Sequence, residues 1–331
     1  MPVQITIIGL GQIGASIGLA LKARGADLTI VGHDKDFRAA KAAQEAGAVD
    51  TWKYNLPDSV RGARLVVLAV PFAEVRETLD VIAPNLQEGT LVLDTALAKG
   101  TVAGWTRELL PAGRFYVGLF PAIHPDHLHG IDYGTSAARA DLFEKSVTVV
   151  TAPAGTPENV FSLALDFISL LGSLPLLMDT AEADGLLSKV QVLPQLAAAA
   201  LLDATLDQPG WLEAKKLAAR PYAAMTSAFA YHDDAVSLRE AALENRENMV
   251  RLLNSYIASL IQLRDELEDG DREALGKRLE AAWHGRIRWF EERSEAEWLN
   301  RESQKIDTPS FGERINQMLF GSALSDRTKR K

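Results

Sequence analysis

Ile5-Thr-Ile-Ile-Gly9-Leu-Gly11-Gln-Ile-Gly14 opens the chain with an apolar run that ends in three glycines spaced G-x-G-x-x-G. In this pattern the first glycine permits a tight turn, the second lets the backbone approach a pyrophosphate, and the third lets a helix pack closely on a strand. Amide groups at the start of that helix face the anion. Because 3–8 reads as a strand and 13–21 has an apolar helix face, the stretch predicts a Rossmann unit that binds a dinucleotide.

A second predicted strand, 28–31, leads to Asp34, twenty residues after Gly14. A carboxylate here accepts from a ribose hydroxyl and repels a 2′-phosphate, so it favours NAD over NADP. Lys35 and Arg38 lie nearby and moderate that preference. The predicted cofactor-binding residues are Gly9, Leu10, Gly11, Gln12, Ile13, Gly14, Asp34, Ala69, Val70, Pro71 and Ala96.

The composition excludes several classes of partner. The net charge of −9 over 331 residues argues against nucleic acid and against an anionic membrane surface. The absence of cysteine excludes disulfides and zinc–thiolate sites and fits a cytoplasmic protein. We expect no signal peptide, because the first apolar run is the predicted nucleotide strand, and no membrane span, because the apolar run 196–202 is too short.

Strand-like runs alternate with helical patterns through residue 178, which predicts an α/β domain built on a parallel sheet. Strand signals then disappear, and helices are predicted over 240–268 and 272–299. The expected organisation is a Rossmann NAD-binding domain at 1–178, an all-helical substrate and dimerisation domain at 179–300, and a C-terminal extension at 301–331.

Six segments follow one another in a familiar order. The first domain contains Gly9-Leu-Gly-Gln-Ile-Gly-Ala-Ser-Ile-Gly18, Val66-Val-Leu-Ala-Val-Pro71, Asp94-Thr-Ala-Leu-Ala-Lys99 and Ala140-Asp-Leu-Phe143, and the helical part contains Leu193-Pro-Gln-Leu-Ala197 and Glu244-Asn-Arg-Glu247. In this order they resemble the prephenate/arogenate dehydrogenase family over about residues 3–268. The resemblance implies oxidative decarboxylation in tyrosine biosynthesis, with hydride transfer to NAD(P)+, a site between two domains, and a homodimer.

The polar residues that the family uses for chemistry differ here. Its Gly-Gly-His-Pro segment, which carries the catalytic base, matches Gly118-Leu-Phe-Pro121, and its serine matches Leu97. Two further family histidines match Gln191 and Gln195. The arginine that holds the substrate carboxylate has no counterpart in 222–236. The resemblance therefore predicts substrate contacts from Lys99, Phe120, Gln191 and Gln195 and indicates an altered substrate.

His124 is the predicted catalytic residue, a general base oriented by Asp126, because it closely follows the segment that carries the family's base. Two other interpretations remain open. His124, His127 and His129 with Asp126 have a spacing that could bind a metal ion, or the segment is a polar surface loop.

These observations predict an NAD-dependent oxidoreductase that acts on a small-molecule substrate. The alternative from another class is a catalytically inactive NAD-binding sensor or dimeric partner protein, which the lost polar residues would fit. A third hypothesis, oxidation of a linear 3-hydroxy acid, lacks the expected lysine–asparagine pair, since Lys189 has no evident partner.

Overall fold

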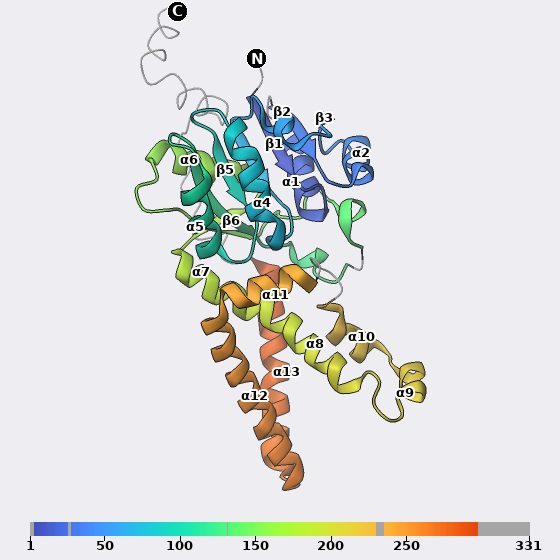
Figure 1. Cartoon of the computed structure of the whole chain (residues 1–331). Helices are drawn as coiled ribbons and strands as arrows, with labels where there is room; N and C mark the ends of the chain where they lie inside the picture. Colours follow the sequence, from blue (N-terminus) through green and yellow to red (C-terminus); the bar gives the residue numbers. More distant parts are fainter. Residues whose placement is uncertain (1–2, 26–27, 131, 230–234, 297–331) are drawn as a thin grey trace, which may run out of the picture. The chain divides into compact units, whose positions relative to one another are not determined.

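The computed structural model describes residues 3–25, 28–130, 132–229 and 235–296. These residues separate into two compact units. The first extends to Ala183 and also includes Ala296, and the second is Asp184–Glu295. Figure 1 shows a sheet with helices on both faces in the first unit and helices alone in the second.

The first unit is built on an eight-stranded sheet in the order β3-β2-β1-β4-β5-β6-β7-β8. Neighbouring strands are parallel except β6 and β7, which pair antiparallel. The strands are β1 (Val3–Ile8), β2 (Leu28–His33), β3 (Thr51–Trp52), β4 (Leu65–Leu68), β5 (Leu91–Asp94), β6 (Phe115–Pro121), β7 (Val147–Thr151) and β8 (Leu174–Leu177). This confirms the predicted Rossmann fold and adds β3, which is too short to give a sequence pattern.

The reversal at β7 corrects the expectation of parallel strands throughout. A parallel neighbour requires a crossover connection that is usually an α-helix. Among the described residues of 122–146, only two 3-10 turns form, η2 (Pro125–His127) and η3 (Gly134–Ala137). Without a crossover helix, the chain returns alongside β6 in the opposite direction.

Six α-helices of the first unit connect or follow the strands of this sheet, and both faces of the sheet are buried. They are α1 (Gln12–Ala23), α2 (Phe37–Glu45), α3 (Leu56–Val60), α4 (Phe72–Ile82), α5 (Lys99–Leu109) and α6 (Glu158–Leu170). Ile5 and Ile7 of β1 join a core with residues of α1 and α6, and Ile8 is buried on the opposite side of the strand. Burial on both faces explains why the central strands read as continuous apolar runs.

The second unit begins within a continuous helix. This helix comprises α7 (Thr180–Leu187), a π-helical turn η4 (Ser188–Val192) and α8 (Leu193–Thr205). It is followed by α9 (Trp211–Leu217), α10 (Arg220–Ser227), α11 (Ala235–Glu244), α12 (Arg246–Glu268) and α13 (Arg272–Glu295). Figure 1 shows α12 and α13 side by side. Arg278 binds Glu266 between them at 2.6 Å, and this hydrogen bond lowers the pKa of the Glu266 carboxyl.

The prediction of one helix over 240–268 is wrong, because the helix is interrupted at Asn245. The Asn245 side chain donates to the carbonyl of Asp184 at 2.8 Å and to Ser188 Oγ at 2.5 Å. These contacts with the π-helical turn set the break between α11 and α12. The other predicted helix corresponds to α13 up to Glu295, while 297–299 lie outside the described residues.

The helix Thr180–Thr205 is long and apolar enough to cross a membrane by length and composition alone. Only 28% of its most apolar window is buried in the single chain. Its buried residues, however, lie along one side of the helix, at Ala183, Leu187, Ser188, Val192, Gln195 and Ala198. Such one-sided burial is the pattern of a helix that packs within a protein domain.

We predict opposite effects for two glycine-to-alanine changes in helices. At Gly18 a Cβ atom would lie 2.1 Å from the Ala48 carbonyl oxygen, whereas at Gly104 nothing lies within 4 Å. Gly18→Ala should lower the free energy of unfolding by about 1–3 kcal/mol, as overpacking does. Gly104→Ala should raise it by about 0.5–1 kcal/mol through helix propensity. Urea denaturation of both variants measures this, and equal losses would contradict the packing described for α1.

Candidate functional site

The glycine-rich loop joins β1 to α1 and forms the centre of the candidate site. Gly9 has a φ of +87°, and a Cβ there would lie 2.3 Å from the Ala69 carbonyl oxygen. A Cβ at Gly14 would lie 1.9 Å from the Gly9 carbonyl oxygen. At Gly11, by contrast, no protein atom lies within 4 Å of a Cβ position. The space beside Gly11 is therefore open for a ligand, and the loop fits a pyrophosphate.

Asp34 follows β2 and lies against this loop. Its Oδ2 accepts from the amide of Leu10 at 2.7 Å, and its Oδ1 accepts from the amide of Asp36 at 2.8 Å. The carboxylate is thus fixed beside the backbone of the glycine-rich loop, at the position expected for contact with a ribose.

The two cations near Asp34 are both paired with carboxylates. Lys35 forms an ion pair with Glu74. Arg38 donates to Asp36 from Nε at 3.0 Å and from Nη2 at 3.1 Å, which lowers the pKa of the Asp36 carboxyl. Neither cation is therefore reserved for a 2′-phosphate, which agrees with the preference for NAD.

The other half of the nucleotide site lies where β4 and β5 end. After β4 come Ala69, Val70 and Pro71, and all three are half-buried. The amide of Ala69 donates to the carbonyl of Ile8, and the amide of Thr95 donates to that of Leu68. Ligands of open α/β sheets bind at such carboxyl ends of strands.

Asp94 ends β5 inside a buried polar cluster. Its Oδ1 accepts from Lys99 Nζ at 2.8 Å and from the amide of Ala96 at 2.8 Å, while its Oδ2 accepts from the Tyr116 hydroxyl at 2.6 Å. Asp94 and Lys99 have no exposed side-chain surface. Lys99 was predicted to contact substrate, but its ammonium lies beneath the surface in an ion pair. The sequence left open that Lys99 binds Asp94 instead of substrate, and the structure shows that bond. Sequence patterns did not identify Tyr116, whose contact with Asp94 depends on strand register.

His124 begins the 3-10 turn η2 as its N-cap. Its Nδ1 accepts from the amide of Asp126 at 3.2 Å, and Asp126 Oδ2 lies 3.7 Å from the same nitrogen. A neutral ring with Nδ1 as acceptor carries its proton on Nε2. Nearby, His127 Nε2 lies 3.1 Å from Asp141 Oδ1. Among residues 3–25, 28–130, 132–229 and 235–296, no group of three or more potential metal ligands occurs, so the metal hypothesis lacks support.

The chain after His124 returns to the glycine-rich loop. Thr135 Oγ1 donates to the Leu10 carbonyl at 2.6 Å, and Gln12 Nε2 donates to the Ala137 carbonyl at 3.4 Å. The amide of Arg139 donates to Ser16 Oγ at 2.9 Å. Residues 135–139, which follow the histidines in the chain, are therefore hydrogen-bonded to the glycine-rich loop and to α1.

The remaining predicted substrate residues lie on different elements, one on a strand of the first unit and two on a helix of the second. Phe120 lies within β6, where it pairs with Val149, and is partly exposed. In the second unit, Gln191 lies in the π-helical turn and Gln195 in the first turn of α8, and Gln195 Nε2 donates to the Gln191 carbonyl at 2.8 Å. Turns of π-helix interrupt α-helices frequently at functional sites.

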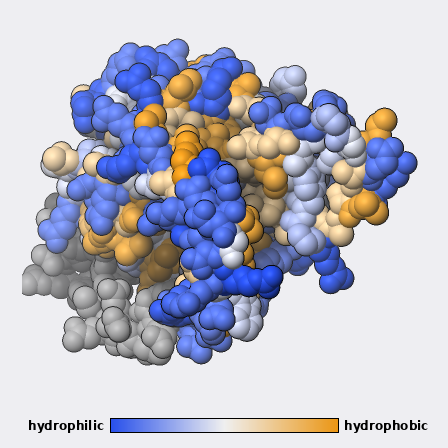
Figure 2. Space-filling model, turned by 90° about the horizontal axis from the view of Figure 1, so that it is seen from below, coloured by the Kyte–Doolittle hydropathy of each residue, from blue (hydrophilic) through white to orange (hydrophobic). Residues whose placement is uncertain are grey.

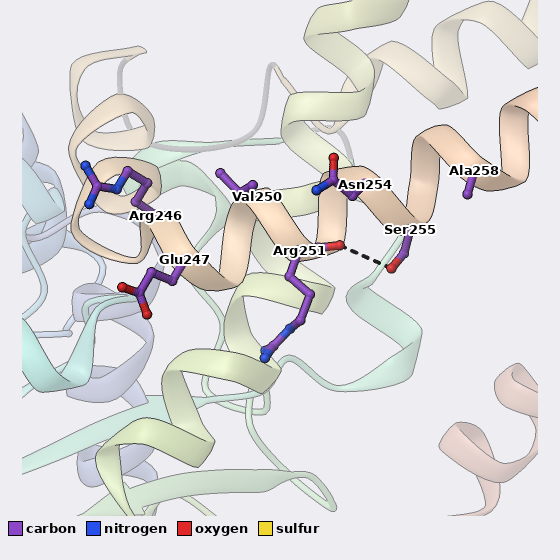
Figure 3. A pocket seen from close by; sticks show the side chains of 7 residues that line it. All are labelled: Arg246, Glu247, Val250, Arg251, Asn254, Ser255 and Ala258. Atoms are coloured by element: carbon purple, nitrogen blue, oxygen red, sulfur yellow. Dashed lines mark hydrogen bonds between the residues drawn. The ribbon is translucent and has the colours of Figure 1, made fainter.

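A second, surface feature was not predicted from the sequence. A hollow of about 740 Å³ lies along one face of α12. Figure 3 shows the side chains that line it, which are Arg246, Glu247, Val250, Arg251, Asn254, Ser255 and Ala258. Within it, Ser255 Oγ donates to the Arg251 carbonyl at 3.1 Å, as the dashed line marks. All its lining residues come from one helix, so it is a groove on the second unit rather than an enclosed site.

The doubly wound sheet, the glycine-rich loop and Asp34 define the class of the protein as an NAD-dependent oxidoreductase. Its sequence matches the family model described as prephenate dehydrogenase, nucleotide-binding domain, over residues 17–174, and the prephenate dehydrogenase dimerization domain over 179–281. The chain therefore belongs to the prephenate dehydrogenase family.

Individual relatives agree with this assignment. The chain is 28% identical to a cyclohexadienyl dehydrogenase of Zymomonas mobilis, over 81% of this chain and 90% of that protein. It is 24% identical to prephenate dehydrogenase of Bacillus subtilis, over 82% and 72%. The fold matches the structure of Aquifex aeolicus prephenate dehydrogenase in complex with hydroxyphenyl propionate and NAD+, with a TM-score of 0.74, 21% identity, and coverage of 87% of this chain and 98% of that one.

Gly11→Ala should separate cofactor binding from folding. The added methyl group meets no protein atom but enters the space expected for the pyrophosphate. We expect the affinity for NADH to fall at least about tenfold, or 1.4 kcal/mol. The melting temperature should stay close to that of the wild type. Fluorescence titration with NADH and thermal denaturation measure the two effects, and unchanged affinity would place the pyrophosphate elsewhere.

Proposed function

We propose that the protein is a cytoplasmic dehydrogenase that oxidises prephenate, arogenate or a related ring-bearing hydroxy acid. The observation that carries this proposal is the glycine-rich loop with its open side at Gly11, in a chain that matches both domains of the family. The named activities of the relatives support the substrate class. Bound NAD supplies a hydride acceptor in such a reaction.

The proposed division of labour follows the predicted domains. Residues 1–178 bind NAD, with Gly9, Gly11 and Gly14 at the pyrophosphate and Asp34 at the ribose. Residues 179–300 form the helical substrate and dimerisation domain, which contributes Gln191 and Gln195. In the first domain Phe120 contacts the substrate, whereas Lys99 acts from beneath the surface through Asp94. No role is proposed for 301–331.

His124 is the proposed catalytic residue for the proton of the substrate hydroxyl. Its Nδ1 accepts from the Asp126 amide, so uptake of a proton at Nδ1 requires that this contact opens. The Asp126 carboxylate, 3.7 Å away, is then placed to stabilise the imidazolium. Phe120 cannot accept a proton, which leaves His124 as the imidazole nearest in sequence to the family's base position.

The proposed reaction is tested by NADH formation from prephenate and from arogenate, with NAD binding measured in parallel. His124→Asn keeps an oxygen that can cap η2 but cannot take up a proton at neutral pH. We expect it to lower turnover by about 10²–10⁴-fold, the usual contribution of general acid–base catalysis. His127→Ala, in the same segment, is the control and should retain most of the activity.

The outcomes separate three possibilities. If His124→Asn turns over normally while His124→Ala does not, His124 has only a capping role. If the wild type binds NAD but oxidises neither substrate, its substrate differs or it acts as a cofactor sensor. If it binds no NAD, the proposal as a whole is wrong.

We further propose that the protein is a homodimer formed by its helical domain. The matching family model is described as a dimerization domain, and large apolar side chains of the second unit are exposed in the single chain. In the long helices these are Leu186, Val190, Val250, Ile257, Leu260, Ile261, Leu267, Leu279, Trp283, Ile287 and Trp289. Figure 2 shows apolar side chains at the surface between hydrophilic ones. A second copy would cover such a surface without any membrane.

Light scattering should give twice the chain mass of 36.0 kDa without detergent. Leu260→Asp should shift the protein toward the monomer, because a carboxylate would be buried in the apolar interface. Tyr54→Asp, at a side chain that is 79% exposed in the first unit, should leave the mass unchanged. A monomeric wild type, or one that needs detergent to stay in solution, would contradict the proposed dimer.

A further inference from the structure

Three strands place polar side chains side by side at the carboxyl end of β5. Asp94 on β5 is in register with Gly118 on β6, which is in register with Thr151 on β7. Residues in register lie on the same face of a sheet, and Tyr116, two residues before Gly118, lies on that face too. The side chains of Asp94, Tyr116 and Thr151 therefore converge over Gly118.

Gly118 makes this arrangement possible. A Cβ atom there would lie 2.5 Å from Thr151 Oγ1, 2.8 Å from the Tyr116 hydroxyl oxygen and 3.0 Å from Lys99 Cδ. Only glycine therefore leaves room for the Tyr116 hydroxyl and the Lys99 side chain. Thr151 Oγ1 is buried and has no hydrogen-bond partner among the described residues, a cost that the packing tolerates.

The charges of the cluster are wholly inside the protein. The side chains of Asp94 and Lys99 are fully buried, and Tyr116 is almost fully buried. In a buried ion pair, the attraction between the charges is offset by the loss of hydration of both ions. The pair therefore contributes little net stability, and an apolar replacement is often as stable. Removing one partner is costly, because a charged group is then left unsatisfied. Packing alone therefore does not account for this cluster.

The cluster instead constrains the turn after β5. Asp94 Oδ1 accepts from the amide of Ala96, which fixes the backbone at 95–96, and the amide of Thr95 is bound to Leu68 at the end of β4. The Tyr116 hydroxyl binds the other oxygen of Asp94 and so determines the rotation of the carboxylate. The shape of this turn depends on Tyr116 through Asp94.

We propose that Tyr116 is a positioning residue for the cofactor. Its hydroxyl holds Asp94, and Asp94 holds the turn that begins at Thr95 in the shape that receives the nicotinamide half of NAD. By the two-fold repeat of the doubly wound fold, the strands β4, β5 and β6 carry that half, while β1 to β3 carry the adenosine half. The inference rests on the proposed function, since it requires that NAD binds.

The test compares Tyr116→Phe on β6 with a matched control, Thr90→Val, just before the neighbouring strand β5. Tyr116→Phe removes one hydroxyl and keeps the ring. Thr90→Val removes a hydroxyl that donates to the Ala63 carbonyl at 2.9 Å, equally buried but next to the opposite end of β5. Dissociation constants are measured for NADH and for ADP-ribose, which carries adenosine and pyrophosphate but no nicotinamide ring. Amide hydrogen exchange at Ala96 is measured without ligand.

Tyr116→Phe should weaken NADH binding about tenfold, as a change of 1.4 kcal/mol would, and leave ADP-ribose binding unchanged. It should also speed exchange of the Ala96 amide. Thr90→Val should lower the melting temperature without changing either dissociation constant or that exchange rate. Equal NADH binding by Tyr116→Phe and wild type, or equal weakening of both ligands, would overturn the inference. Failure of the wild type to bind either ligand would instead refute the proposed function.

Discussion

The close approach of α1 to β1 at Gly14 is the constraint on which both the sheet and the cofactor site depend. A Cβ atom at Gly14 would lie 1.9 Å from the Gly9 carbonyl oxygen, so no other residue permits this packing. The contact directs the start of α1 toward the carboxyl end of β1. The N-cap residue, Gly11, forms no side-chain cap, and therefore the first-turn amides are left for an anion. One backbone contact thus fixes the helix and leaves its N-terminus available to a ligand.

The sequence predicted those parts of the structure that depend on local pattern. A strand buried on both faces reads as an apolar run, which is why the strand predicted at 3–8 agrees with the bounds of β1. The glycine spacing predicted the loop as well, because Gly9 and Gly14 each meet a backbone carbonyl while Gly11 borders open space. The loss of strand signals after residue 178 predicted the helical domain. Only the family resemblance suggested its role, because helical periodicity alone does not distinguish it from other helical folds.

The features that the sequence did not predict are set by contacts between distant residues. Asn245 is compatible with a helix, and the break there follows from its bonds to Asp184 and Ser188. The antiparallel direction of β7 follows from the connection between β6 and β7, which contains no crossover helix among its described residues, and not from the sequences of the two strands. Likewise, Tyr116 reads as an ordinary strand residue, and its contact with Asp94 appears only once β5 and β6 are in register.

β6 extends beyond the end of β5, and Phe120 lies in this extension. β5 ends at Asp94, opposite Gly118, but β6 continues for three residues to Pro121 by pairing with β7. Phe120 is thereby held in a strand, where its backbone pairs with Val149. The loop begins after Pro121, and a histidine followed by proline occurs near its start, at His124 and Pro125, four residues after Phe120 and Pro121. The proposed base His124 thus lies in a connection whose later residues Thr135 and Arg139 are hydrogen-bonded to Leu10 in the glycine-rich loop and to Ser16 in α1.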